Sequence, residues 1–319
     1  MSGSGGSTDT PCAPPVARPP ALLRRFAEAH GLGDGSIVPL RATGVANDVW
    51  ALGDDLVLRI GRGSLEAWSD ARTESVAVPA ARAARVRTPA LILCDLSGSV
   101  FDAPVTVYER VHGETLGLVL EQRAGWSDCL RGLGRDLARL HLRVAAVDDP
   151  RGWLDRPDME DSRAWLAACG TADLLPPAEL AFFERWLARL EPAARAPVVP
   201  RFLHNDVHAL NVMVDAGGAY LALLDWGDAG WGDPAIELAT FAADGLDDLF
   251  AGYAEEAPEL AGAGFPGRVL WNQIGHALRK AARSSPGRTP ELATAHLRGL
   301  AAFARAARGP WRAWAPDLS

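Results

Sequence analysis

The chain has almost no lysine. Of its 319 residues, one is lysine and thirty-one are arginine. This bias is more simply explained by GC-rich coding than by function. It still limits the chemistry, because the single lysine, Lys280, comes too late to serve a site built from the first part of the chain.

Paired cysteines are also missing. Cys12, Cys94, Cys129 and Cys169 lie far apart and form no C-x-x-C pair. This spacing argues against a zinc ribbon and against a disulfide framework. We expect these cysteines to be packing residues of a protein in the reducing cytoplasm.

Long hydrophobic runs and basic patches are absent as well. No apolar run approaches the roughly 20 residues that a bilayer requires, so no membrane span is expected. Residues 1–17 lack the basic start and apolar core of a secretory signal, and we predict a disordered tail. A net charge of −8 without a basic patch disfavours nucleic-acid binding. With 48% hydrophobic and 23% charged residues, the composition is typical of a soluble enzyme.

Three polar side chains have the spacing that magnesium-dependent phosphoryl transfer requires. Asp206 follows an apolar run, Asn211 comes five residues later, and Asp225 ends a second apolar run that predicts a strand at 220–224. Phosphoryl transfer needs one carboxylate to orient the acceptor hydroxyl and oxygen ligands to hold magnesium on the phosphates. The spacing therefore predicts a kinase with Asp206 as the base and Asn211 and Asp225 as magnesium ligands.

The same segment resembles a known family. The sequence HNDVHALN (204–211) resembles the H-G-D-x-H-x-x-N catalytic loop of the aminoglycoside phosphotransferase and choline kinase-like family. Asp225-Trp226 resembles its D-W metal motif, and the G-D-P at 232–234 resembles its following turn. One residue departs from the pattern, because Asn205 stands where glycine is usual. Asparagine tolerates such turn geometry nearly as well.

The resemblance implies an α+β, bilobal protein kinase-like fold. Its small antiparallel-sheet N-terminal lobe would comprise residues 18–112, and its mainly helical C-terminal lobe residues 113–319. Strands of a five-stranded sheet are predicted at 37–40, 48–52, 56–60, 90–94 and 105–108. Helices are predicted at 65–85, with Pro79 kinking or ending its first part, and at 126–142, 177–195, 235–263, 269–283 and 289–308. We interpret His141 as a satisfied core histidine.

The N-terminal lobe of such a kinase grips the nucleotide phosphates with a basic residue on its third strand, which a helix glutamate holds. Arg59 occupies this position, and a guanidinium can bind two phosphate oxygens. Glu74 is the expected partner, with Glu66 as the alternative. The resemblance also includes the G-x-x-N turn with Gly44 and Asn47, whose backbone would cover the phosphates.

The resemblance further implies a hinge after the fifth strand. There the backbone carbonyl of Glu109 and the backbone amide of Val111 would form hydrogen bonds with adenine. Because backbone groups would form these hydrogen bonds, the identity of the side chains in this segment has little effect on them.

An acidic window indicates the charge of the acceptor. Between Phe202 and Gly267 the chain has twelve acidic residues and no lysine or arginine. Such a field attracts cations, although charge runs are usually solvated helix faces. Candidate acceptor contacts are Asp228, Asp244, Asp247, Asp248 and Trp271.

The sequence thus predicts a phosphotransferase that moves the γ-phosphoryl of ATP or GTP to a hydroxyl of a small, cationic acceptor. The simplest such acceptor is an antibiotic, and the consequence would be resistance. A metabolic kinase of choline, homoserine or a sugar is the alternative enzyme. A nucleotide-binding pseudokinase or scaffold is the alternative of another class.

Overall fold

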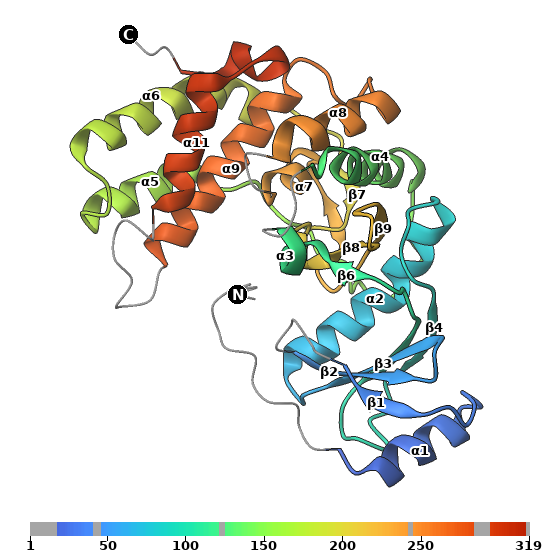
Figure 1. Ribbon diagram of the computed structural model, residues 1–319. Helices are drawn as coiled ribbons and strands as arrows, with labels where there is room; N and C mark the ends of the chain where they lie inside the picture. The colour runs from blue at the N-terminus through green and yellow to red at the C-terminus, as the bar shows by residue number, and fades with distance from the viewer. Residues whose placement is uncertain (1–17, 41–45, 121–124, 242–244, 284–293, 317–319) are drawn as a thin grey trace.

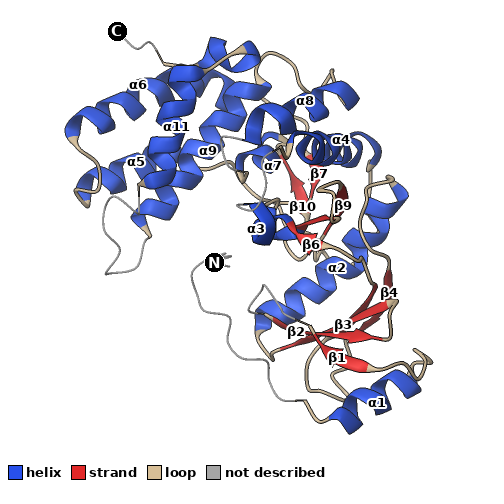
Figure 2. Ribbon diagram, viewed as in Figure 1, coloured by secondary structure: helices blue, strands red, loops and turns tan. Residues whose placement is uncertain are grey.

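The computed structural model describes residues 18–40, 46–120, 125–241, 245–283 and 294–316. Figure 1 shows a small part built on a β-sheet and a larger part built mainly from helices. Figure 2 shows that the largest sheet lies in the small part, whereas short strands lie where the two parts meet. In the described residues, no helix is long and apolar enough to cross a membrane.

The small part contains a five-stranded antiparallel sheet with the order β1-β2-β3-β5-β4. Each strand begins and ends within one residue of the predicted positions. Their bounds are β1 (Ile37–Pro39), β2 (Asn47–Leu52), β3 (Leu56–Gly61), β4 (Leu91–Asp95) and β5 (Val105–Glu109).

Alternation along β3 and β5 gives this sheet two different faces, because successive side chains of a strand point in opposite directions. Leu58 and Ile60 are buried under α1 (Pro20–Ala29), in a cluster that includes Phe26. Arg59 and Tyr108 point to the other face, where α2 (Leu65–Ala83) lies. Figure 1 shows α1 and α2 on opposite sides of the sheet.

Helix α2 covers nearly all of the predicted range 65–85. Its N-cap is Ser64, whose hydroxyl accepts a hydrogen bond from the Ala67 amide at 3.1 Å. Pro79 lies inside the helix, and the helix does not end there. One face packs on the sheet, and Ala77, Val78 and other small residues join the core of the helical part.

The helical part follows the hinge. The predicted helix at 235–263 is instead two helices, α7 and α8. Gly245, the N-cap of α8, lies so close to α4 that an added Cβ would be 2.8 Å from Leu130 Cδ1. The bounds are α3 (Leu116–Val119), α4 (Ser127–Arg143), α5 (Ser162–Thr171), α6 (Pro177–Ala194), α7 (Ala235–Ala239), α8 (Leu246–Glu256), α9 (Phe265–Ala282), α11 (Ala295–Ala306) and the 3-10 helix η4 (Gly309–Trp314).

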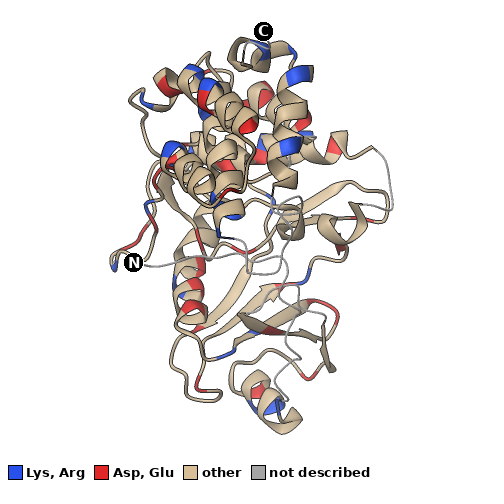
Figure 3. Cartoon of the chain, turned by 90° about the vertical axis from the view of Figure 1, so that its left-hand side faces the viewer, with Lys and Arg blue, Asp and Glu red and all other residues tan. Residues whose placement is uncertain are grey.

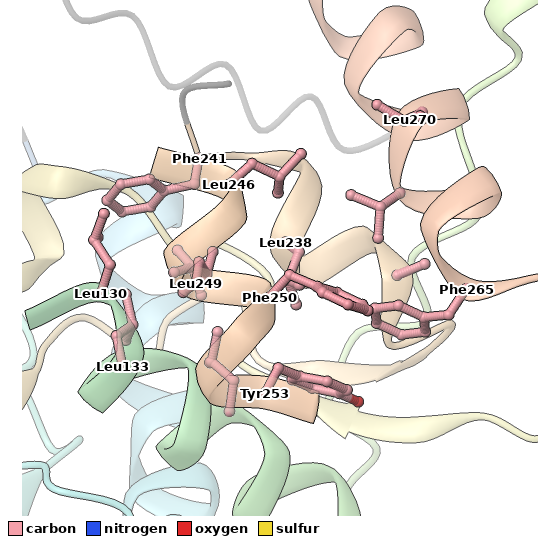
Figure 4. Packing of buried hydrophobic residues seen from close by; sticks show 14 of the residues in the cluster. Leu130, Leu133, Leu238, Phe241, Leu246, Leu249, Phe250, Tyr253, Phe265 and Leu270 are labelled. Carbon is pink, nitrogen blue, oxygen red and sulfur yellow. The ribbon is translucent and has the colours of Figure 1, made fainter. Parts of the chain in front are cut away.

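The core of the helical part lies between α4, α8 and α9. Two glycines bring α4 and α8 into close contact: a Cβ at Gly134 would collide with the Leu249 carbonyl, and one at Gly252 with the Arg131 carbonyl. Figure 4 shows leucines of α4 packed against α8, whose aromatic residues reach toward Phe265. This close packing gives the elements that follow a rigid base.

Short strands between the two parts form the base of the site. β7 (Arg201–Leu203) pairs with β10 (Gly230–Gly232), and β6 (Glu114–Thr115) pairs with β8 (Val212–Val214), which pairs with β9 (Tyr220–Leu223). The 3-10 helix η2 (Ala209–Asn211) precedes β8. The β8–β9 hairpin thus places Asn211 and Asp225 at the same end, where the Leu224 amide donates to the Asn211 carbonyl at 2.8 Å.

Candidate active site

The loop between β7 and η2 has an unusual backbone that a buried carboxylate holds in place. Asn205 has a φ of 69°, a conformation that asparagine adopts more readily than most residues. The amides of His204 and Asn205 both donate to Glu237 of α7, each at 2.7 Å. Since Glu237 is fully buried, these two donors satisfy it and fix the loop.

His141 supports this arrangement from α4. Its Nε2 lies 3.3 Å from Glu237, and its Nδ1 lies 2.8 Å from the hydroxyl of Tyr253. The imidazole is fully buried and both nitrogens have partners. It is therefore a satisfied core histidine, as predicted, and it also lies behind the catalytic loop.

His204 connects this loop to the end of β9. Its Nε2 donates to the Leu224 carbonyl at 2.8 Å, and its Nδ1 accepts from the Asp206 amide at 3.2 Å. Trp226 packs edge-on against the imidazole and donates to Thr88 of the small part at 3.0 Å. The two loops that carry Asp206 and Asp225 are thus bound to each other.

Asp206 lies at the open side of this loop, and its side chain is 37% exposed. Its Oδ2 accepts from Asn211 Nδ2 at 3.0 Å and lies 3.2 Å from His208 Nε2. Burial alone would raise the pKa of Asp206, but the hydrogen bond and charge of His208, with smaller contributions from His204 and Asn211, lower it. The carboxylate is therefore ionised and can accept a proton.

Asn211 and Asp225 provide oxygen ligands that suit magnesium. The Asn211 amide nitrogen donates to both the carbonyl and the carboxylate of Asp206, which leaves its side-chain oxygen for a cation. Asp225 has a φ of 65°, and its side chain is 43% exposed. Among the described residues, no three His, Cys, Asp or Glu side chains form a complete metal site.

The basic residue of β3 connects the two parts. Arg59 Nη1 lies 2.6 Å from Glu74 of α2, and its Nη2 lies 3.3 Å from Asp225. Glu66, the alternative partner, is exposed in the first turn of α2. Burial would lower the pKa of Arg59, but the charges of Glu74 and Asp225 outweigh it and raise that pKa.

Tyr108 completes this group. Its hydroxyl donates to Glu74 at 2.5 Å, and burial together with the Glu74 charge raises the pKa of the phenol well above its usual range. Tyr108 was not among the residues predicted for the site. Side chains alternate between the two faces of the sheet along β5 as they do along β3. This alternation could have placed Tyr108 on the same face as Arg59.

Excess negative charge surrounds Asp225. Burial and the charges of Asp225 and Glu74 raise the pKa of Asp70 to about 8. Burial and the charges of Asp206 and Asp225 raise the pKa of Asp228 to about 7. Asp70 lies against Gly227, where an added Cβ would be 2.9 Å from it. The site therefore favours a bound cation.

The other residues predicted to bind the nucleotide belong to the small part and to the connection that follows it. Asn47 is the first residue of β2, whereas Gly44 is outside the described residues. Glu109 is the last residue of β5, and Val111 follows in the connection to β6. The predicted hinge thus lies where the small part passes into the helical part.

The residues predicted to contact the acceptor do not all lie together in the structure. Asp228 lies near Asp206 and Asp225, but Asp248 accepts from Ser127 of α4 at 2.6 Å and pairs with Arg131 at 3.3 Å. Asp247 is exposed on α8, and Asp244 is outside the described residues. Trp271 is a buried residue of α9 whose indole donates to the Glu160 carbonyl at 2.8 Å.

Arginines of α4 neutralise part of the acidic window. Glu255 pairs with Arg131 and Arg135, and Glu256 pairs with Arg139 and Arg143. Figure 3 shows basic and acidic positions side by side on the helical part. The window is therefore not a single acidic field, and only its carboxylates near Asp206 support a cation at the site.

The five-stranded sheet, the Arg59–Glu74 pair and the mainly helical second part form a protein kinase-like fold. Residues 37–271 match the family model described as the phosphotransferase enzyme family. The chain belongs to this family, as its motifs predicted. No curated protein matches its sequence.

Several solved structures share the fold. A choline/ethanolamine kinase family protein from Mesorhizobium loti is 18% identical, with a TM-score of 0.58 over 91% of this chain and 95% of that one. The GDP complex of an aminoglycoside 2'-phosphotransferase-IIIa mutant is 14% identical, with a TM-score of 0.60 over 88% and 95%. A thermostable mutant of aminoglycoside phosphotransferase APH(4)-Ia, in complex with ADP and hygromycin B, is 16% identical, with a TM-score of 0.54 over 90% and 99%.

Proposed function

We propose that this phosphotransferase moves the γ-phosphoryl of ATP or GTP to a hydroxyl of a small, positively charged acceptor in the cytoplasm. The observation that carries the proposal is the convergence of Asp206, Asn211 and Asp225 at one end of the β8–β9 hairpin. Arg59 reaches the same point from the small part.

The proposed chemistry divides between these residues. Asp206 accepts the proton of the acceptor hydroxyl as that oxygen attacks the γ-phosphorus. Arg59 binds the phosphates, and the backbone around Gly44 and Asn47 covers them. Asn211 and Asp225 would hold Mg²⁺, which, when bound, offsets the negative charge of the phosphates.

The base of the nucleotide would lie against the hinge, on the backbone of Glu109 and Val111. Support for a nucleotide comes from the structures with the same fold, whose complexes contain GDP, ADP or AMP-PNP.

A cationic acceptor is favoured by the carboxylates around Asp206. Asp228 is the best candidate to contact it, because burial and its acidic neighbours raise its pKa to about 7, and a bound cation would offset these charges. Asp248 receives less support, since Arg131 and Ser127 already bind it.

An antibiotic is the favoured acceptor. Solved structures of the same fold contain hygromycin B, streptomycin, gentamicin or kanamycin. A phosphate would add roughly −1.5 to −2 charge to such a ligand and weaken its binding to an anionic target, which would give resistance. A choline-type kinase is the second candidate, because one similar structure belongs to that family and choline is itself a cation.

A transfer assay with γ-labelled ATP and GTP would test the proposal. The acceptors are kanamycin, gentamicin, streptomycin and hygromycin B in one arm, and choline, ethanolamine and homoserine in the other. Label transfer to an aminoglycoside supports the antibiotic proposal, and transfer to choline alone supports the metabolic one. Nucleotide binding without transfer or hydrolysis contradicts both and favours a scaffold.

A further inference from the structure

The two carboxylate oxygens of Asp206 have different environments. Oδ2 accepts from Asn211 Nδ2 at 3.0 Å and lies 3.2 Å from His208 Nε2. Oδ1 has no hydrogen-bond partner among the described residues. The Asp206 side chain as a whole is 37% exposed to solvent. Oδ1 is therefore the oxygen at which no partner among the described residues competes with an incoming hydroxyl.

The imidazole of His208 is held at its other nitrogen. His208 is the N-cap of η2, and its Nδ1 accepts from the Leu210 amide at 3.2 Å. An amide N–H can donate only to an unprotonated nitrogen, so the proton of the neutral ring is on Nε2. That proton points to Asp206 Oδ2.

We propose that His208 is a positioning residue, which holds Oδ2 of Asp206 so that Oδ1 receives the proton of the acceptor hydroxyl. This inference rests on the proposed function. In the transfer, the acceptor oxygen bonds to the γ-phosphorus while its proton passes to Oδ1. The bond from the γ-phosphorus to the bridging oxygen breaks, and its electron pair leaves with the nucleoside diphosphate. His208 neither gains nor loses a proton.

A second donor on Oδ2 is needed because Asn211 has other contacts. Its amide nitrogen is shared between the carbonyl and the carboxylate of Asp206, and its oxygen is the proposed cation ligand. Asn211 therefore holds the carboxylate only in part. The Nε2 side of the imidazole contacts the carboxylate, whereas its Nδ1 accepts from the Leu210 amide. A carboxylate with two donors on one oxygen rotates less.

Two substitutions separate this role from capping of η2. Asparagine is a good N-cap residue and can accept from the Leu210 amide, but it is too short to reach Asp206. Glutamine extends an amide nitrogen to about the position of Nε2 and is a poorer cap. If His208 positions Asp206, His208→Asn loses activity and His208→Gln retains more of it. If His208 only caps η2, the order is reversed.

The assay is hydrolysis of ATP or GTP without an acceptor, in which water takes the place of the hydroxyl. We expect His208→Asn to lower kcat by roughly 10- to 100-fold, while His208→Gln stays within a few-fold of the wild type. The nucleotide KM should remain unchanged in both. Equal kcat values in the wild type and His208→Asn would overturn the inference, as would a smaller loss in His208→Asn than in His208→Gln.

Histidine NMR provides a readout that does not depend on turnover. With ¹⁵N-labelled protein, on the alkaline side of the imidazole titration, the signal lost in His208→Gln should carry its proton on Nε2. Asp206→Asn should shift that signal. A proton on Nδ1, or a signal insensitive to Asp206→Asn, overturns the inference. Absence of wild-type turnover with either nucleotide contradicts the proposed function, and the NMR result then decides the inference separately.

Discussion

At the scale of single residues, the site depends on two non-glycine residues in the left-handed region. Asn205 precedes the proposed base, and Asp225 is the proposed metal ligand. This conformation costs less for asparagine and aspartate than for most residues. Asn205 is further stabilised by the Glu237 carboxylate and by its own contact with the Asp228 carbonyl at 3.2 Å.

Asp225→Ala tests the proposed magnesium site. We expect this variant to lose the increase in melting temperature that magnesium gives in the presence of ADP, because a bound ligand stabilises only through its contacts with the folded state. Differential scanning fluorimetry with ADP, with and without magnesium, measures the effect. Asp247→Ala, at an exposed position of α8, is the matched control. A wild-type response in Asp225→Ala would mean that the ion is held elsewhere.

At the scale of elements, α7 fixes the catalytic loop although the two are separated in sequence. Glu237 of α7 accepts from two consecutive loop amides, and His141 of α4 lies behind it. Thr240, at the end of α7, donates to the Val207 carbonyl at 2.5 Å. The loop geometry thus depends on α7 and α4 and not on the loop sequence alone.

Glu237→Gln tests this role. Glutamine can accept one of the two amide protons, but its own amide nitrogen opposes the other, so a buried donor loses its partner. We expect a loss of about 1–3 kcal/mol in the free energy of unfolding, together with a lower kcat. Urea unfolding and steady-state kinetics measure the two effects. Glu184→Gln, on the exposed side of α6, should change neither, and an unchanged Glu237→Gln would contradict the role.

The strands of the five-stranded sheet were predictable because each is short, apolar and bounded by turn residues, and the apolar run at 220–224 likewise predicted β9. The contacts of Glu237 could not be predicted from the sequence, since they join residues more than thirty positions apart. For the same reason, the sequence did not show that some carboxylates of the acidic window are paired with arginines. The arginines that neutralise Glu255 and Glu256 lie on α4, and no local pattern shows that α4 packs on α8.

At the scale of the whole molecule, ion pairs of Arg59 and a hydrogen bond of Trp226 link the two parts. Arg59 joins Glu74 of the small part to Asp225 of the helical part, and Trp226 reaches across to Thr88. Asp70 adds a further carboxylate on α2. Without a bound cation, this arrangement leaves more negative charge than Arg59 offsets.

This charge predicts a pH dependence of stability. The pKa of Asp70 rises from its ordinary value of 3.8 to about 8 in the folded chain. Between these values the folded state binds more protons than the unfolded state, so the free energy of unfolding falls as pH rises. The raised pKa of His208 acts in the same direction, whereas the pKa of His276, lowered to about 4, acts oppositely below its ordinary value of 6.5.

We therefore expect the melting temperature of the ligand-free protein to fall by a few degrees between about pH 6.5 and 8, and to fall less in Asp70→Asn. Calorimetry across this range measures the difference. Asp54→Asn, in the exposed turn between β2 and β3, should behave like the wild type. Equal slopes in Asp70→Asn and the wild type would show that Asp70 does not titrate in this range.

The most direct test of the proposed function is the turnover of Asp206→Asn with the best acceptor and nucleotide found by the transfer assay. Asparagine preserves the size of the side chain but cannot accept the hydroxyl proton. The account predicts a fall in kcat of about 10²- to 10⁴-fold, with nucleotide affinity within a few-fold of the wild type. Near-normal turnover in this variant would contradict the account, because Asp206 would then not be the base.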